Sequence, residues 1–152
     1  MQFTPDNSWK EKRISLIEKI PDCEILTKVT GREEINLNPH SHNRHQIIYI
    51  LSGTLHIETG EKNHFVTEKN LVWIPEGTVH RLSSNNRQIS LLVGYFHTDS
   101  KADDSFGIFR TDEMTARILE FISSKRRINI HKSPEIYSFA YGFLCAIPHI
   151  CN

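Results

Sequence analysis

The sequence predicts a mainly β fold, a jelly-roll barrel of about eight strands followed by a C-terminal pair of α-helices. Short runs of β-branched and aromatic residues, separated by turn residues, fill positions 24–97. Two segments with apolar residues at helical spacing follow them. A length of 152 residues suits one domain with a single core. We therefore expect an N-terminal arm or short helix at 1–22, the barrel at 23–110 and a helical dimerisation or linker region at 111–152.

Turn residues mark the limits of the predicted strands. The run 45–51 is rich in isoleucine, and Ser52-Gly53 turns the chain into the run 54–58. In that second run apolar and polar residues alternate, which is typical of a strand with one buried face. The next turn and the remaining long runs lie at 60–63, 70–74 and 88–96.

Capping residues predict the limits of the two helices. Asp112 has the side chain of an N-cap, and the basic segment 125–127 suits the negative end of the first helix. The second helix begins with Ser133 as its cap and Pro134 in its first turn. We expect Pro148 to end this second helix.

The second helix carries a wide apolar face that needs a partner. Ala140 and Leu144 widen a stripe at helical spacing, and burying such side chains is worth ~1.5–3 kcal/mol each. The stripe could pack as simple core, but we favour a seam between two copies of the chain, because two-fold dimers are the commonest assembly. The stripe consists of Ile136, Phe139, Phe143 and Ile147.

Composition argues against several classes of function. The 18 basic and 18 acidic residues balance, so the bulk of the chain is no polycation for nucleic acid, and we interpret 125–127 as a solvated helix end. No apolar run approaches the ~18 residues of a membrane span, and the N-terminus lacks a signal peptide. An odd number of cysteines without zinc-type spacing indicates reduced thiols in the cytoplasm, at Cys23, Cys145 and Cys151.

Three histidines and one amide are spaced so that a small barrel can bring them together. His40, His42 and Gln46 share one parity, so they point to the same face of an extended strand. His80 follows a Pro-x-Gly turn at 75–77 that redirects the chain. Two interpretations stay open: these four residues hold one divalent metal (zinc, nickel or iron), or they hydrogen-bond an organic ligand directly.

Other aromatic and imidazole side chains are candidates for the same site or lie near it in the sequence. Tyr49 and Trp73 could line an effector pocket, although aromatic residues on strands are more often core. His45 has the opposite parity and is expected outside the pocket. We expect His56 and His64 on the surface of their strands rather than among the ligands.

The spacing of these residues resembles a known superfamily. The segment 40–53 reads H-x-H-x3-Q-x6-G and 75–80 reads P-x-G-x2-H, and together they resemble the two motifs of the cupin superfamily. Gln46 stands where the first motif has glutamate. Both motifs normally begin with a glycine, and here Glu34 and Lys69 stand at or beside those positions. The closing asparagine is displaced to Asn85.

The strings "HSHNRHQIIYILSGTLHIETG" and "NLVWIPEGTVHRLSS" resemble the sensor domain of AraC-type transcriptional regulators over residues 24–97. This resemblance implies a cupin barrel that binds a small polar effector such as a sugar, helices that make a homodimer, and DNA binding by a helix-turn-helix domain. No such domain lies within the 152 residues, so we expect DNA contacts only outside them. The resemblance therefore implies that this chain is a sensor and not an enzyme.

The alternative is a stand-alone, metal-dependent cupin enzyme of the dioxygenase, isomerase or epimerase type. Such an enzyme needs an acid or base inside the barrel. Outside the motif residues no strand carboxylate is clearly placed inward, because Glu58 falls on an outward face and Glu76 in a turn. A storage or sugar-binding module would differ from the sensor only in what it is tethered to.

Overall fold

A computed structural model describes residues 16–31, 35–84, 89–98 and 105–151. Two of the motif positions, Glu34 and Asn85, lie outside these described residues, as does most of the predicted N-terminal arm. Within the arm, 16–18 forms a helical turn, and Ile17 in this turn and Ile20 after it are buried.

The described residues form nine strands and two long helices. Asp112 caps the first helix as predicted, because its carboxylate accepts a hydrogen bond from the Thr115 backbone N–H at 2.8 Å. The elements are β1 (Glu24–Val29), β2 (His45–Ser52), β3 (Leu55–Thr59), β4 (Lys62–Val66), β5 (Asn70–Ile74), β6 (Arg81–Ser84), β7 (Ser90–Phe96), β8 (Gly107–Arg110), α2 (Glu113–Ser124), β9 (Arg127–Asn129) and α3 (Pro134–Ile150).

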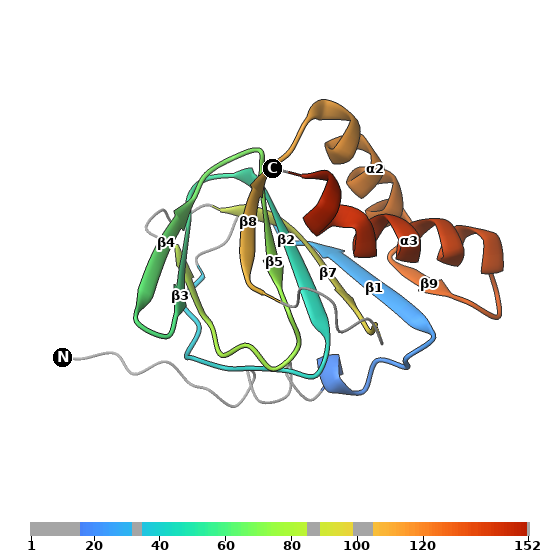
Figure 1. The fold of residues 1–152 in the computed structure, drawn as a ribbon, viewed down its shortest axis with the longest axis horizontal. Helices are drawn as coiled ribbons and strands as arrows, with labels where there is room; N and C mark the ends of the chain where they lie inside the picture. Colours follow the sequence, from blue (N-terminus) through green and yellow to red (C-terminus); the bar gives the residue numbers. More distant parts are fainter. Residues whose placement is uncertain (1–15, 32–34, 85–88, 99–104, 152) are drawn as a thin grey trace.

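Two antiparallel sheets face each other and make the barrel (Figure 1). One sheet has six strands in the order β8-β5-β2-β7-β1-β9, and the other has three in the order β4-β3-β6. Apolar side chains from both inner faces fill the space between the sheets. This inner core consists of Ile48, Ile50, Leu55, Ile57, Val66, Val72, Ile74, Leu82, Ile89, Leu91 and Val93.

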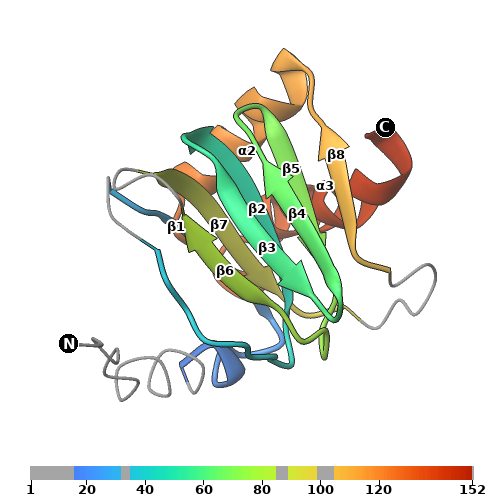
Figure 2. The ribbon, with the colours of Figure 1, turned by 90° about the vertical axis from the view of Figure 1, so that its left-hand side faces the viewer.

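Both helices cover the outer face of the six-stranded sheet, and Figure 2 shows them behind it. The outer core joins alternate sheet residues, among them Ile47, Tyr49 and Trp73, to the inward side of α2 and α3. β2 is therefore buried on both faces, which explains its nearly continuous apolar sequence. Within the described part of the chain, no helix is both long and apolar enough to cross a bilayer.

The short strand β9 lies between the helices and was not predicted. It pairs antiparallel with β1 at the edge of the large sheet, so Arg127 continues into a strand after α2 ends at Ser124. Pro148 was wrongly expected to stop the second helix, since α3 continues to Ile150. The missing proline N–H affects only the last turn, where Ile147 is completely buried against the sheet.

The apolar stripe of α3 is divided between core and surface. Ala140, Leu144 and Ile147 are fully buried in the outer core, so the predicted placement of Ile147 in a seam between copies is wrong. Phe143 is half-buried against the same core. Phe139 instead leaves 50 % of its surface exposed. The outer face of the barrel therefore covers the inward side of the helix, because both layers offer apolar surface there.

Lys69, at the position of a motif glycine, keeps a glycine-like backbone. Its φ is 69°, in the left-handed region that side chains with a β-carbon disfavour. Thr111 holds this conformation, because its backbone N–H and its hydroxyl both donate to the Lys69 carbonyl, at 3.1 and 2.8 Å. The fold thus requires the glycine geometry although the sequence supplies lysine.

Candidate metal and ligand site

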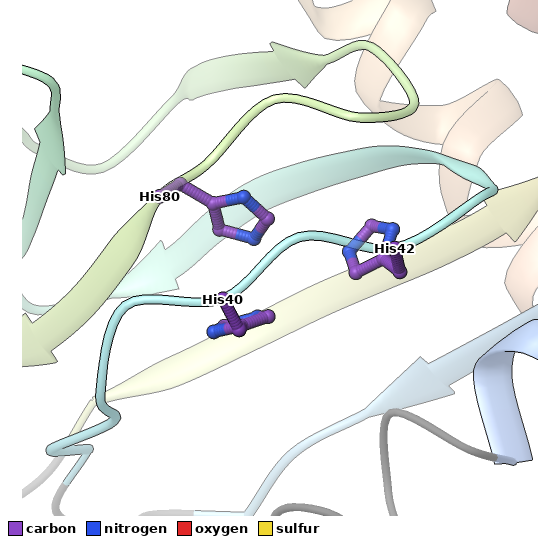
Figure 3. A group of neighbouring side chains, drawn as sticks. All are labelled: His40, His42 and His80. Atoms are coloured by element: carbon purple, nitrogen blue, oxygen red, sulfur yellow. The ribbon is translucent and has the colours of Figure 1, made fainter.

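Three histidines meet at one end of the barrel, between the two sheets (Figure 3). His40 and His42 lie on the segment that leads into β2, and His80 directly precedes β6. His40 and His80 form an antiparallel bridge with backbone hydrogen bonds of 2.9 and 2.8 Å. Residues directly opposite in such a bridge point to the same side, which brings these two rings to a centroid distance of 4.3 Å.

The predicted turn before His80 ties both histidine segments together. The Thr78 N–H donates to the Pro75 carbonyl at 3.2 Å, and Gly77 has a φ of 81°. This is the conformation that a turn residue without a β-carbon adopts most readily. The Gly77 N–H donates across to the His42 carbonyl at 2.9 Å. The turn therefore positions His42 as well as His80.

The ring nitrogens are close enough to share one cation. One ligand nitrogen from each of His40, His42 and His80 lies within 4.8 Å of the others. In octahedral coordination, two ligands about 2.1 Å from a metal are about 3.0 Å apart in adjacent positions and about 4.2 Å apart in opposite ones. Small ring rotations would close the remaining difference. The structure thus brings together the three predicted histidine ligands.

Backbone carbonyls set the tautomer of all three rings. The Nδ1 atoms lie 3.0 Å from the Asn38 carbonyl for His40, 2.8 Å from the Arg44 carbonyl for His42 and 2.8 Å from the Thr78 carbonyl for His80. A carbonyl only accepts hydrogen bonds, so each neutral ring must carry its proton on Nδ1. The lone pair is then on Nε2. Metal-binding histidines are commonly oriented by this kind of second hydrogen bond.

Gln46 completes the predicted group from the inner face of β2. Its side-chain oxygen lies 2.9 Å from Nε2 of His42. With the His42 proton on Nδ1, this contact sets two lone pairs against each other, at the spacing of adjacent ligands around one cation. A protonated ring, or an amide turned over to donate its N–H, satisfies the same spacing without a metal. The donor set fits a divalent cation, and an experiment can distinguish these states.

His80 is suited to a role as a neutral ligand. It is only 1 % exposed, and among the described residues its Nε2 has no hydrogen-bond partner. Burial and, to a lesser degree, the neighbouring rings of His40 and His42 lower the pKa of His80 to about 3, although the Thr78 carbonyl opposes this shift. The ring is therefore unprotonated at neutral pH, as metal coordination requires.

Two predicted effector contacts, Tyr49 and Trp73, lie on the other side of the sheet. Both belong to the outer core beneath the helices, whereas Gln46 faces the barrel interior. Their prediction as pocket residues is wrong, because parity along β2 places Tyr49 opposite to Gln46. His45 lies outside the pocket as expected, completely buried against Trp73 and Phe96.

Two inward-facing residues were missed by sequence reasoning. Tyr95 pairs with Gln46 across β2 and β7, and its hydroxyl lies 3.4 Å from the amide nitrogen of Gln46. The Tyr95 ring also stands edge-on to His42. His64 was expected on the surface, but it pairs with the inward residue Ile57 and is half-buried. The position of each residue in the alternation along its strand is the sequence feature that could have identified Tyr95 and His64 as inward-facing.

The outward-facing residues agree with expectation. His56 lies on the outer face of the small sheet and stacks on Phe65, with a centroid distance of 4.7 Å. Glu58 accepts a hydrogen bond from Arg81 at 3.0 Å on that face. Glu76 stands in the turn with its carboxylate 3.7 Å from Nδ1 of His97.

Comparison with known proteins bears on the barrel and on the helices that follow it. Residues 29–93 match the family model described as a cupin domain. The barrel has the cupin fold. No curated protein matches the sequence.

Among solved structures, an apo variant of ToxT from Vibrio cholerae is 13 % identical with a TM-score of 0.57, and the match covers 81 % of this chain and 55 % of ToxT. ToxT from the same organism bound to an unsaturated fatty acid is 14 % identical with a TM-score of 0.55, covering 79 % and 53 %. KdgF from a Halomonas species is 17 % identical with a TM-score of 0.43, covering 48 % of this chain and 69 % of KdgF. This chain therefore spans about half the length of ToxT, and at these identities the likeness to ToxT concerns the fold.

Proposed function

We propose that this chain is the ligand-sensing domain of an AraC-type transcriptional regulator, and that its cupin barrel binds a small effector together with one divalent metal. The observation that carries the proposal is the convergence of His40, His42, Gln46 and His80 inside a barrel that is followed by a docked helical pair. The likeness to ToxT supports it, because that match covers 81 % of the chain.

In this proposal His40, His42 and His80 hold the metal through Nε2, and Gln46 supplies its side-chain oxygen. The bound cation would supply a positive anchor for a polar group of the effector. The chain itself contributes rigid placement of its ligands. The Asn38, Arg44 and Thr78 carbonyls orient the three rings, and the Gly77 turn holds the two ligand segments together.

Dimerisation is the second part of the proposal, and the surface differs from the predicted stripe. An apolar groove of about 470 Å³ opens between α2 and α3. The exposed apolar side chains that line the groove come from both helices, and we assign the groove as the contact surface with a second copy of the chain. Glu113 and Arg117 form an ion pair of 2.9 Å beside it, and a two-fold axis would let these charges pair between copies. The groove is lined by Glu113, Met114, Arg117, Ile118, Phe121 and Phe139.

We assign DNA recognition to a domain outside the 152 residues and propose that the protein acts in the cytoplasm. In this arrangement the effector changes how two copies hold their DNA-binding domains. The described histidine cluster contains no carboxylate that could act as a general base. This composition favours a sensor over the alternative, a stand-alone cupin enzyme of the dioxygenase, isomerase or epimerase type.

The test measures metal content and ligand binding on the same purified protein. We expect about one zinc, nickel or iron per chain after metal loading, and no consumption of oxygen or of added ligands. His42→Ala should lose the metal, because it removes a ring that contacts both Gln46 and the other histidines. His56→Ala is the matched control, since His56 lies on the outer face and should leave metal content unchanged.

The outcomes separate sensor from enzyme. One iron per chain, with oxygen consumed when a substrate is added and lost in His42→Ala, would assign the barrel to the enzyme class. Metal binding without turnover supports the sensor. Equal metal content in wild type and His42→Ala would remove the metal site from the proposal altogether.

A further inference from the structure

The ligand set of the histidine site contains no negative charge. Among the described residues, the group of side chains able to hold a metal consists of His40, His42 and His80 without any carboxylate. The fourth donor, Gln46, is a neutral amide. A divalent cation bound here would therefore keep its full charge. This charge would lie against three side chains that are almost completely buried, since His42, Gln46 and His80 are 4, 3 and 1 % exposed, whereas His40 is half-buried.

Two carboxylates of the described barrel, Glu58 and Glu76, are engaged elsewhere. Glu58 pairs with Arg81 on the outer face of the small sheet, and Glu76 stands in its turn beside His97. An uncompensated charge in a buried site is strongly unfavourable. Among the described residues no acidic side chain belongs to the histidine group, so the neutralising charge would have to come from a ligand.

We infer that the metal-loaded site selects a small organic carboxylate over a neutral ligand such as a sugar. This inference rests on the proposed metal site and deepens it. A carboxylate oxygen brings the missing negative charge to the cation, whereas a hydroxyl of a neutral sugar does not. Gln46 is then the residue that determines specificity, because a glutamate there would already neutralise one charge and would reduce the attraction for an anion.

Tyr95 is placed to contact the second carboxylate oxygen. Its ring stands edge-on to His42 at a centroid distance of 5.7 Å, and its hydroxyl lies 3.4 Å from the Gln46 amide. A phenolic O–H donates readily to an ionised oxygen. Three partly buried apolar side chains pack against the inner core, and we expect them to contact the carbon part of the ligand. They are Ile35, Leu37 and Phe106.

The test uses pairs of probes that share a shape and differ in charge. Wild-type protein loaded with Co²⁺, whose absorption spectrum reports its ligands, is titrated with acetate and acetamide, then with benzoate and benzamide. We expect each carboxylate to change the spectrum and to bind about tenfold or more tightly than its amide. This comparison needs no variant, so it does not depend on the folding of a mutant.

Gln46→Glu provides the second arm at nearly constant size. We expect it to bind Co²⁺ at least as tightly as wild type and to bind acetate and benzoate about tenfold or more weakly. Tyr95→Phe should keep the Co²⁺ spectrum of the loaded protein and weaken the carboxylates several-fold. His56→Gln, on the outer face, is the control that should change neither measurement.

The two ways of failing are distinct. If Co²⁺ binds but amides compete equally with carboxylates, or if Gln46→Glu leaves carboxylate binding intact, the inference of anion selection is overturned and the metal site stands. If the wild-type protein takes up no Co²⁺, or takes up as much after His42→Ala, the metal part of the proposed function fails and the inference fails with it.

Discussion

Replacing Phe139 by aspartate tests whether the groove between α2 and α3 joins two copies of the chain. Phe139 leaves 50 % of its surface in water, next to Phe121, which leaves 46 %, and Met114, which leaves 71 %. Phe139 and Phe121 already contact each other edge-to-face. Covering these side chains is therefore the contribution that a second copy would make.

The expected effect follows from the area involved. A phenylalanine side chain offers ~200 Å², so about 100 Å² of Phe139 would be covered in each copy. Two copies together cover about 200 Å², which at ~25 cal/mol per Å² contributes about 5 kcal/mol to association. Phe139→Asp should therefore raise the dissociation constant of the dimer by about a thousandfold or more.

Sedimentation equilibrium over a range of concentrations measures this constant directly. Phe65→Asp is the matched control, because Phe65 is 62 % exposed on β4 of the small sheet, away from the groove, and should leave the dimer intact. Phe143 is unsuitable for this test, since it packs against the outer core and its replacement would destabilise the fold. A wild-type protein that is monomeric at about 50 μM, or an equal effect of both substitutions, would refute the seam.

Two further predictions concern the stability of the metal-free protein. Because the pKa of His80 falls from 6.5 to about 3 on folding, the unfolded chain binds a proton that the folded chain does not, and stability should fall as the pH drops from 6.5 toward 3. Urea unfolding in the presence of a chelator should show that the free energy of unfolding changes by up to about 1.4 kcal/mol per pH unit because of this ring. His80→Gln should remove this dependence, and His131→Gln, at an exposed histidine, should retain it. An unchanged slope in His80→Gln would contradict the assignment. Lys69→Gly should raise the free energy of unfolding by up to about 1 kcal/mol, because relief of the strain in the left-handed backbone exceeds the added entropy of the unfolded chain. Lys69→Ala should give no gain, since alanine keeps the β-carbon. Equal stability of all three proteins in urea would show that the backbone is unstrained.

The histidine site was accessible to sequence reasoning because its geometry is local. The two-residue period of extended backbone predicted that His40, His42 and Gln46 share a face, and the turn that redirects His80 depends on proline and glycine at fixed positions. Only Gln46 lies on β2, however, because the chain bends at 43 and 44, so the backbone bridge between His40 and His80 and the Gly77 hydrogen bond to His42 bring the histidines to it. The limits of the helices were predictable for the same reason at Asp112 and Pro134. Pro148 shows where this reasoning stops, because packing of the last turn of α3 against the sheet outweighed a local preference.

The sequence by itself determined which residues share a face, since alternation along a strand is a property of the backbone. It could not determine which face is the inside, because β2 is apolar on both sides and either could have been covered by helices. Only the docking of α2 and α3 placed Tyr49 and Trp73 in the outer core and left Gln46 and Tyr95 at the histidines. That choice depends on the summed burial of residues far apart in the chain, and no short stretch of sequence contains that sum.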